Sequence, residues 1–147
     1  MRPTILALDL EGTLISNAIS QIPRPGLLRF LDDMQSQFDR LVIFTTVPEE
    51  RTRTIAALLV GEGTAPSWFA ELDYISWSGK TKDPRYVSPH LGSTLLLDDH
   101  GPYVHPGQDH LWIEAPLFGS PYLREDYGLQ VATRRILERL SLLGRSS

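Results

Sequence analysis

Short apolar runs that each end in polar residues recur along the chain. A run of about five apolar residues bounded by turn residues is typical of an interior strand of a parallel sheet, where both faces are covered. The first run, Thr4 to Leu8, ends on Asp9 and Glu11 and continues into Gly12 and Thr13. The same pattern predicts further strands over residues 40–44, 73–77, 94–98 and 110–114.

Helical patterns lie between these predicted strands. Apolar residues recur at helical spacing from Leu27 to Met34, and Pro48 with two following acids is typical of the first turn of a helix, which is expected to end near Gly61. A closing amphipathic helix is predicted over residues 130–143. Connectors, turns and loops are predicted for residues 66–72, 83–91, 99–109 and 115–127.

The alternation of strands and helices predicts an α/β fold. We expect a Rossmann-like three-layer α/β/α sandwich with a mainly parallel sheet and right-handed crossovers. The length of 147 residues suits one domain, residues 1–147, with a sizeable core. Ligands of open parallel sheets bind beyond the carboxyl ends of the strands, so the polar residues that end each run are expected to gather there.

Composition narrows the function classes. The net charge of -4 and the pI of about 5.5, without a polybasic run, do not favour binding to nucleic acid or to anionic membranes. Cysteine is absent, which excludes disulfides, thiolate metal sites and cysteine nucleophiles. No segment approaches the roughly 20 apolar residues that span a bilayer, so we expect a cytoplasmic protein without a membrane partner.

The polar residues after the strands suit the chemistry of phosphate esters. A phosphoryl group needs a nucleophile, a partner for its charge and a proton donor for the leaving oxygen. Asp9 and Glu11 would repel one another and an anionic substrate, so Mg²⁺, a hard cation that prefers oxygen ligands, is the expected compensation. In isolation the two acids also fit a solvated turn. Asp98-Asp99 likewise fits a plain turn, and Thr45 fits a cap of the following helix.

The four histidines, at positions 90, 100, 105 and 110, are not predicted to form a zinc site, because their spacing matches no ligand motif. His100 and His105 closely follow the acid pair, and we expect them to line the substrate entrance. The aromatic residues of the last third of the chain, Trp112, Phe118 and Tyr122, are predicted to be packing residues.

The order of carboxylates, hydroxyl, lysine and acid pair resembles the four motifs of the haloacid dehalogenase (HAD) superfamily of phosphohydrolases, over most of the chain. The resemblance implies a HAD-like core in which Asp9 attacks phosphorus to give an aspartyl-phosphate, while Glu11 acts as acid and base. Glu11 departs from the usual aspartate, although members with glutamate there, such as enolase-phosphatases, are active. The implied phosphate-binding residues are Thr45, Thr46 and Lys82. The implied Mg²⁺ ligands are Asp9, the backbone carbonyl of Glu11, Asp98 and Asp99.

Two lysines, Lys80 and Lys82, compete for the lysine role because they lie on the same predicted loop. Lys82 with the two residues after it, and its distance to Asp98, resembles the Lys-Asp-Leu segment of carboxy-terminal-domain phosphatases and nuclear-LIM-interactor-like proteins, which favours Lys82. The threonine pair after Phe44 resembles the Phe-Thr-Ala segment of this group. Its Asp-x-Asp-Glu-Thr motif is not matched here.

The gaps between the motifs leave no room for the cap domain that closes over small substrates in many members of the superfamily. The gap from Thr13 to Arg40 holds one loop and one predicted helix, and the gap from Thr46 to Lys82 holds one helix, a connector and a strand. A HAD-like core without a cap has an open site. We therefore expect either a phosphorylated macromolecule, such as a protein, as substrate or a homo-oligomer that covers the site.

Two other kinds of function are compatible with the same residue types. Receiver domains also use an acid pair, an acceptor aspartate, a hydroxyl and a lysine, but there the acid pair comes first, whereas here it comes last. The order of motifs therefore disfavours a receiver. A phosphate-binding or protein-interaction module without turnover, built on the HAD fold, is the alternative to an enzyme.

Overall fold

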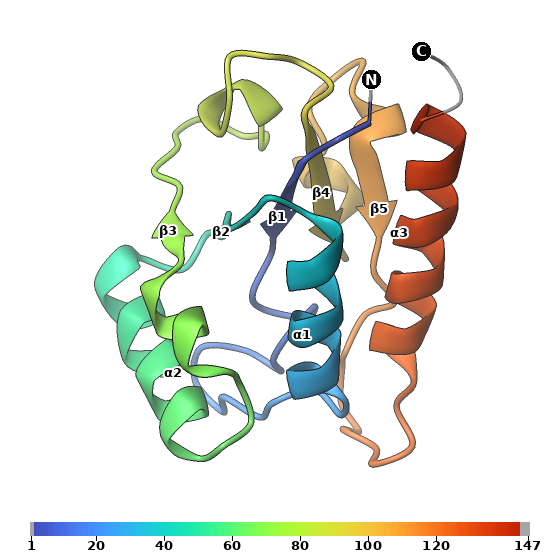
Figure 1. Cartoon of the computed structure of the whole chain (residues 1–147). Helices are drawn as coiled ribbons and strands as arrows, with labels where there is room; N and C mark the ends of the chain where they lie inside the picture. The colour runs from blue at the N-terminus through green and yellow to red at the C-terminus, as the bar shows by residue number, and fades with distance from the viewer. Residues whose placement is uncertain (1, 145–147) are drawn as a thin grey trace.

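The core of the fold is a parallel sheet (Figure 1). In the computed structural model, which describes residues 2–144, five strands pair in the order β3-β2-β1-β4-β5, and every pair is parallel. The predicted α/β fold with a Rossmann-like parallel sheet is confirmed. The strands are β1 (Ile5–Leu8), β2 (Arg40–Ile43), β3 (Asp73–Tyr74), β4 (Thr94–Asp98) and β5 (Trp112–Glu114).

The central strand β1 is apolar because both of its faces are covered. It pairs with β2 on one side and with β4 on the other, so that Leu8 is level with Ile43 and with Leu97. Successive side chains of β1 point to opposite faces of the sheet: Leu6 and Leu8 pack in one apolar cluster, whereas Ala7 packs in the other. This register also fixes which residues meet where the strands end.

Three α-helices of the described residues cover one face of the sheet: α1 (Leu27–Gln37), α2 (Glu49–Gly61) and α3 (Gly128–Gly144). Their apolar residues recur at helical spacing and share one core with the strands, as the sequence predicts. The inward-facing residues of α1 illustrate this spacing: Leu27, Phe30, Leu31 and Met34.

The other face of the sheet is covered by 3-10 turns and loops. The ring of Tyr86, in the 3-10 turn Pro84–Tyr86, packs edge-on against Phe44. Tyr103, in the 3-10 turn Gly101–Tyr103, packs against Trp77, which itself contacts Phe44. On this face, short 3-10 turns and loops stand where a layer of helices was expected. Prolines at four positions of these segments, 84, 89, 102 and 106, disfavour longer helices.

Several element boundaries differ from the sequence-based expectation. β3 ends at Tyr74 and not at residue 77, because this edge strand pairs only with Val42 and Ile43. β5 begins at Trp112 and not at residue 110, because Asp109–Leu111 forms a 3-10 turn. α3 begins at Gly128, two residues earlier than predicted.

The connections between strands are short at the two places where a cap would be inserted. Within residues 2–144, α1 is the only α-helix between β1 and β2, and α2 with the 3-10 turn Ser67–Glu71 fills the connection between β2 and β3. The expected core without a cap is confirmed. No helix of this part of the chain is long and apolar enough to cross a membrane.

Candidate active site

Three carboxylates meet at the carboxyl edge of the sheet. Asp9 follows β1, Asp98 ends β4 and Asp99 comes next, and the parallel pairing of Leu8 with Leu97 brings these strand ends together. One oxygen of each carboxylate lies within 4.8 Å of the others. Asp9 and Asp98 are buried, and Asp99 is half-buried. The sequence predicted this convergence.

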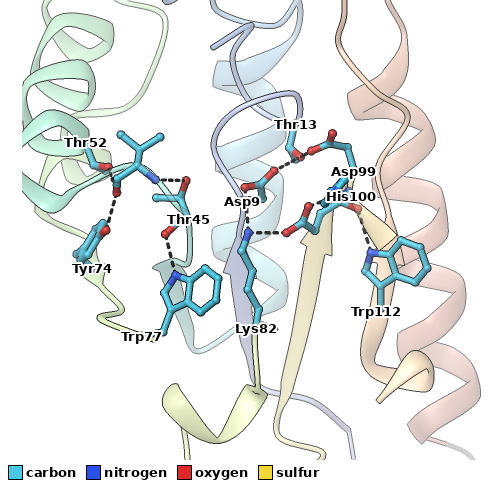
Figure 2. A network of polar contacts seen from close by, with 12 residues as sticks. Asp9, Thr13, Thr45, Thr52, Tyr74, Trp77, Lys82, Asp99, His100 and Trp112 are labelled. Atoms are coloured by element: carbon cyan, nitrogen blue, oxygen red, sulfur yellow. Dashed lines mark hydrogen bonds and ion pairs between the residues drawn. The ribbon is translucent and has the colours of Figure 1, made fainter. Parts of the chain in front are cut away.

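Lys82 supplies the positive charge among these carboxylates. It reaches into the group from the loop after β3 (Figure 2), and its Nζ lies 3.1 Å from Oδ1 of Asp9 and 2.5 Å from Oδ2 of Asp98. The side chain is fully buried beneath the ring of Tyr103, whose centroid is 5.0 Å from Nζ. Lys80 is exposed, so Lys82 is the lysine of this group.

Burial and charge shift the ionisation of the group. Burial raises the pKa of Asp9 well above the usual 3.8, against the effect of Lys82 and with that of Asp98. Burial also raises the pKa of Asp98, again opposed by Lys82. Burial by itself would lower the pKa of Lys82, but the two carboxylates outweigh it and raise that pKa above 10.5. Lys82 is therefore positively charged between the two acids. A further positive charge nearby would stabilise the ionised form of these acids.

Thr13 links two of the carboxylates. Its fully buried hydroxyl lies 2.8 Å from Oδ2 of Asp9 and 3.0 Å from Oδ1 of Asp99 (Figure 2). The neighbouring Gly12 has a φ of 76°, and a Cβ there would lie 2.8 Å from Oδ2 of Asp99. Gly12 therefore allows both the turn and the close approach of Asp99. Sequence reasoning placed Thr13 in the motif and did not assign it a contact.

Glu11 lines the same cleft as the three carboxylates, and one of its oxygens is bound by the loop that follows. Its Oε2 accepts a hydrogen bond of 2.6 Å from the backbone N–H of Ala18, and the side chain is half-buried. Its side chain is not part of the group whose oxygens converge. The role of Glu11 as acid and base, and that of its carbonyl as a metal ligand, stay predictions.

The two predicted phosphate-binding threonines, Thr45 and Thr46, lie in different environments. Thr45 is buried, and its Oγ1 accepts a hydrogen bond of 3.2 Å from the N–H of Val47, so it closes a turn before α2. The residue at the N-cap of α2 is Pro48, so Thr45 is not its cap. Thr46 is exposed and lines the same cleft as Asp9. Of the two threonines, Thr46 is the one that lines the cleft over the acids.

A cleft of about 180 Å³ opens over the carboxylates. His100 and Tyr103 form part of its wall, their rings 4.6 Å apart, which agrees with the expectation for His100. His105 does not line the cleft: its Nδ1 lies 2.8 Å from the hydroxyl of Thr81, and its Nε2 lies 3.5 Å from Asp83. Trp112 packs against the second apolar cluster, as predicted, and its indole also donates to the carbonyl of Asp98 at 2.9 Å.

Comparison with known proteins identifies the fold. No protein-family model matches the chain, and no curated protein matches its sequence. Among solved structures, the chain is similar to a variant of the RNA polymerase II CTD phosphatase Fcp1 of fission yeast bound to beryllium fluoride, with a TM-score of 0.56 and 15% identity. The match covers 98% of this chain and 54% of that one, so this chain spans about half its length. The likeness shows that the two proteins share the same α/β fold.

Proposed function

We propose that the chain is a Mg²⁺-dependent phosphatase, a phosphomonoester hydrolase that acts through an aspartyl-phosphate on Asp9, with residues 1–147 as a single domain. The observation that carries the proposal is the meeting of Asp9, Asp98 and Asp99 with the buried ammonium of Lys82 at the carboxyl edge of a HAD-like sheet. The fold it shares with a phosphatase supports the same reaction class.

The donor set fits Mg²⁺. This ion prefers carboxylate, carbonyl and water oxygens, and the converging atoms are oxygens of three carboxylates. Lys82 offsets only one of their three negative charges, so a divalent cation would balance the charge that remains. We assign the metal site to Asp9, Asp98 and Asp99, with the backbone carbonyl of Glu11 as a further ligand. The bound ion would supply a positive charge that draws the phosphate oxygens toward Asp9.

In the proposed mechanism, an oxygen of Asp9 attacks phosphorus and the bond from phosphorus to the leaving oxygen breaks. Glu11 gives a proton to that oxygen, then takes one from water, whose oxygen attacks the aspartyl-phosphate and releases inorganic phosphate and free Asp9. Lys82 orients the carboxylate of Asp9 through the 3.1 Å contact. Glu11 lines the cleft, and proton transfer through its Oε2 requires that oxygen to leave the Ala18 amide.

The phosphate itself is assigned to Thr46, Lys82 and the turn at Thr45. Thr46 lines the acid cleft, and the turn closed by Thr45 fixes its backbone. The carbonyl of Val47, in the same turn, accepts hydrogen bonds from Tyr74 at 2.5 Å and from Thr52 at 3.3 Å (Figure 2). A loop held from several sides presents its hydroxyl without a large entropic cost.

The substrate we propose is a phosphorylated macromolecule, and a protein in particular. No cap closes over the cleft within the described chain, and large apolar side chains on the loops around it are exposed: Leu117 is 65% exposed and Ile19 is 88% exposed. Leu117 lies beside the cleft, since a Cβ on Gly12 would meet both it and Asp99. An exposed leucine there suits a segment of substrate that extends beyond the phosphate.

The experiment is a phosphatase assay with small phosphate esters, phosphopeptides and phosphorylated polynucleotide ends, each with Mg²⁺ and with a chelator. We expect Mg²⁺-dependent release of phosphate, fastest from phosphopeptides. Binding of the esters without release would support the alternative, a non-catalytic module on the HAD fold. Sedimentation of the same sample tests whether a homo-oligomer covers the site.

A further inference from the structure

Arg24 is a buried cation that the proposed mechanism does not use. It precedes α1, is only 2% exposed and is the largest of the fully buried side chains in the described part of the chain. Its guanidinium lies 5.3 Å from the centre of the Phe118 ring. A charge in such a place is costly unless several partners hold it, so its contacts indicate what it does.

The guanidinium joins two distant parts of the chain. Its Nε and Nη2 donate to the two carboxylate oxygens of Asp126, at 2.7 and 3.3 Å. Its Nη1 donates to the backbone carbonyl of Thr13 at 3.1 Å. Arg24 therefore ties the loop that follows Asp9 to the segment before α3, and the fork of the guanidinium suits these two directions.

Asp126 and Gly128 hold the guanidinium in place from the side of α3. Oδ1 of Asp126 also accepts a hydrogen bond of 2.9 Å from the N–H of Gly128, the first residue of α3. A Cβ on Gly128 would clash with the guanidinium of Arg24. Glycine at this position is thus required by the guanidinium and not by the backbone of the helix.

Thr13 connects Arg24 to two of the three carboxylates. The carbonyl of Thr13 meets Arg24, while its hydroxyl meets Asp9 and Asp99. We propose that Arg24 is a positioning residue for the Mg²⁺ site: by holding Thr13 against Asp126, it sets the distance between Asp9 and Asp99. The inference rests on the proposed metal site, and it concerns residues that lie outside that site.

This role differs from one in stability alone. Arg24 makes no hydrogen bond to the three carboxylates, so its loss changes their spacing indirectly, through Thr13 and its neighbours. Residues that orient metal ligands in this way affect metal affinity by about 10- to 100-fold when changed. A buried ion pair that only stabilised the fold would change the unfolding temperature and leave the Mg²⁺ affinity of the folded protein intact.

The test is calorimetric titration of Mg²⁺ into the wild-type protein and into Arg24→Lys, which keeps the charge and loses the fork. Arg40→Lys is the matched control, because Arg40 makes an exposed pair of 2.9 Å with Asp73, far from the acids in sequence. Asp98→Ala serves as the reference for a lost site. We expect affinity to fall about tenfold in Arg24→Lys and to stay unchanged in Arg40→Lys.

Gly128→Ala and Asp126→Asn disturb Arg24 by other means and should weaken Mg²⁺ binding in the same way; they decide the question if Arg24→Lys does not fold. Unchanged Mg²⁺ affinity in folded variants, whatever their unfolding temperature, would overturn the inference while leaving the metal site intact. Failure of the wild-type protein to bind Mg²⁺ would instead overturn the metal site, and this inference with it.

Discussion

The ammonium of Lys82 lies 2.5 Å from Oδ2 of Asp98, and both side chains are fully buried. Removing one partner of a buried charge pair leaves the other charge buried and unpaired, which strongly destabilises the fold. Lys82 also contacts Asp9, so one cation serves two buried carboxylates. Removing Lys82 would leave both carboxylates without this partner.

Replacing Lys82 with methionine should destabilise the metal-free protein by about 3 to 5 kcal/mol at neutral pH, because two carboxylates lose their buried partner. Chemical denaturation measures the change. Lys80→Met is the control, since Lys80 is exposed on the same loop, and it should change stability little. Equal stability of Lys82→Met and wild type would show that the carboxylates do not depend on the lysine.

Mg²⁺ binding should strengthen as the pH rises. The pKa values of Asp9 and Asp98 are raised above the usual 3.8, mainly by burial, so protons compete with the metal over a range above that value. In the metal-free protein these raised values mean that stability is lost as pH rises through them, which Mg²⁺ should reverse. We expect thermal stabilisation by Mg²⁺ to be small at acidic pH and to grow as the pH rises to neutral. A stabilisation independent of pH would contradict the assignment of these carboxylates as ligands.

Replacing Glu11 with glutamine should slow turnover by about a hundredfold or more, because the amide cannot transfer the proton. The fold should be kept, since the amide oxygen of glutamine can still accept from the Ala18 N–H. Steady-state kinetics beside a thermal melt makes the check. A variant with most of the wild-type rate would remove Glu11 from the proposed mechanism.

Leu117→Asn should lower kcat/KM for phosphopeptides with an apolar residue beside the phosphate by about tenfold, which is a loss of about 1.4 kcal/mol. The rate with a small phosphate ester should not change. Leu91→Asn is the control, because Leu91 is 49% exposed and precedes β4, at the opposite end of the strands. An equal loss with both substrates would mean that Leu117 supports the site and does not select the substrate.

The sequence predicted the acids of the site because parallel strands carry their ends to one edge. Asp9 and Asp98 each follow an apolar run, and the pairing of β1 with β4 brings them together as expected. The choice of Lys82 over Lys80 also agrees with the geometry, since only Lys82 is buried among the acids. These features depend on local patterns and on one general property of parallel sheets.

The contacts of Arg24 could not be predicted in the same way. Arg24 and Asp126 are 102 residues apart, and neither lies in a periodic segment that fixes its direction. In the sequence, Arg24 is only the residue before a proline and a glycine at a helix start. The end of β3 also differs from the sequence-based expectation, because Ile75 and Trp77 pack in the second apolar cluster, and beyond the Ile75 N–H bond to Ile43 the segment no longer pairs with β2.

The most direct test of the account is the turnover of the best phosphate ester by wild type and by Asp9→Asn in saturating Mg²⁺. Asparagine keeps the size of the side chain but replaces the nucleophilic carboxylate with a neutral amide, so the variant should fold and lose at least about a thousandfold in kcat. A folded Asp9→Asn protein that retains most of the wild-type rate would contradict the assignment of Asp9 as the nucleophile of a Mg²⁺-dependent phosphatase.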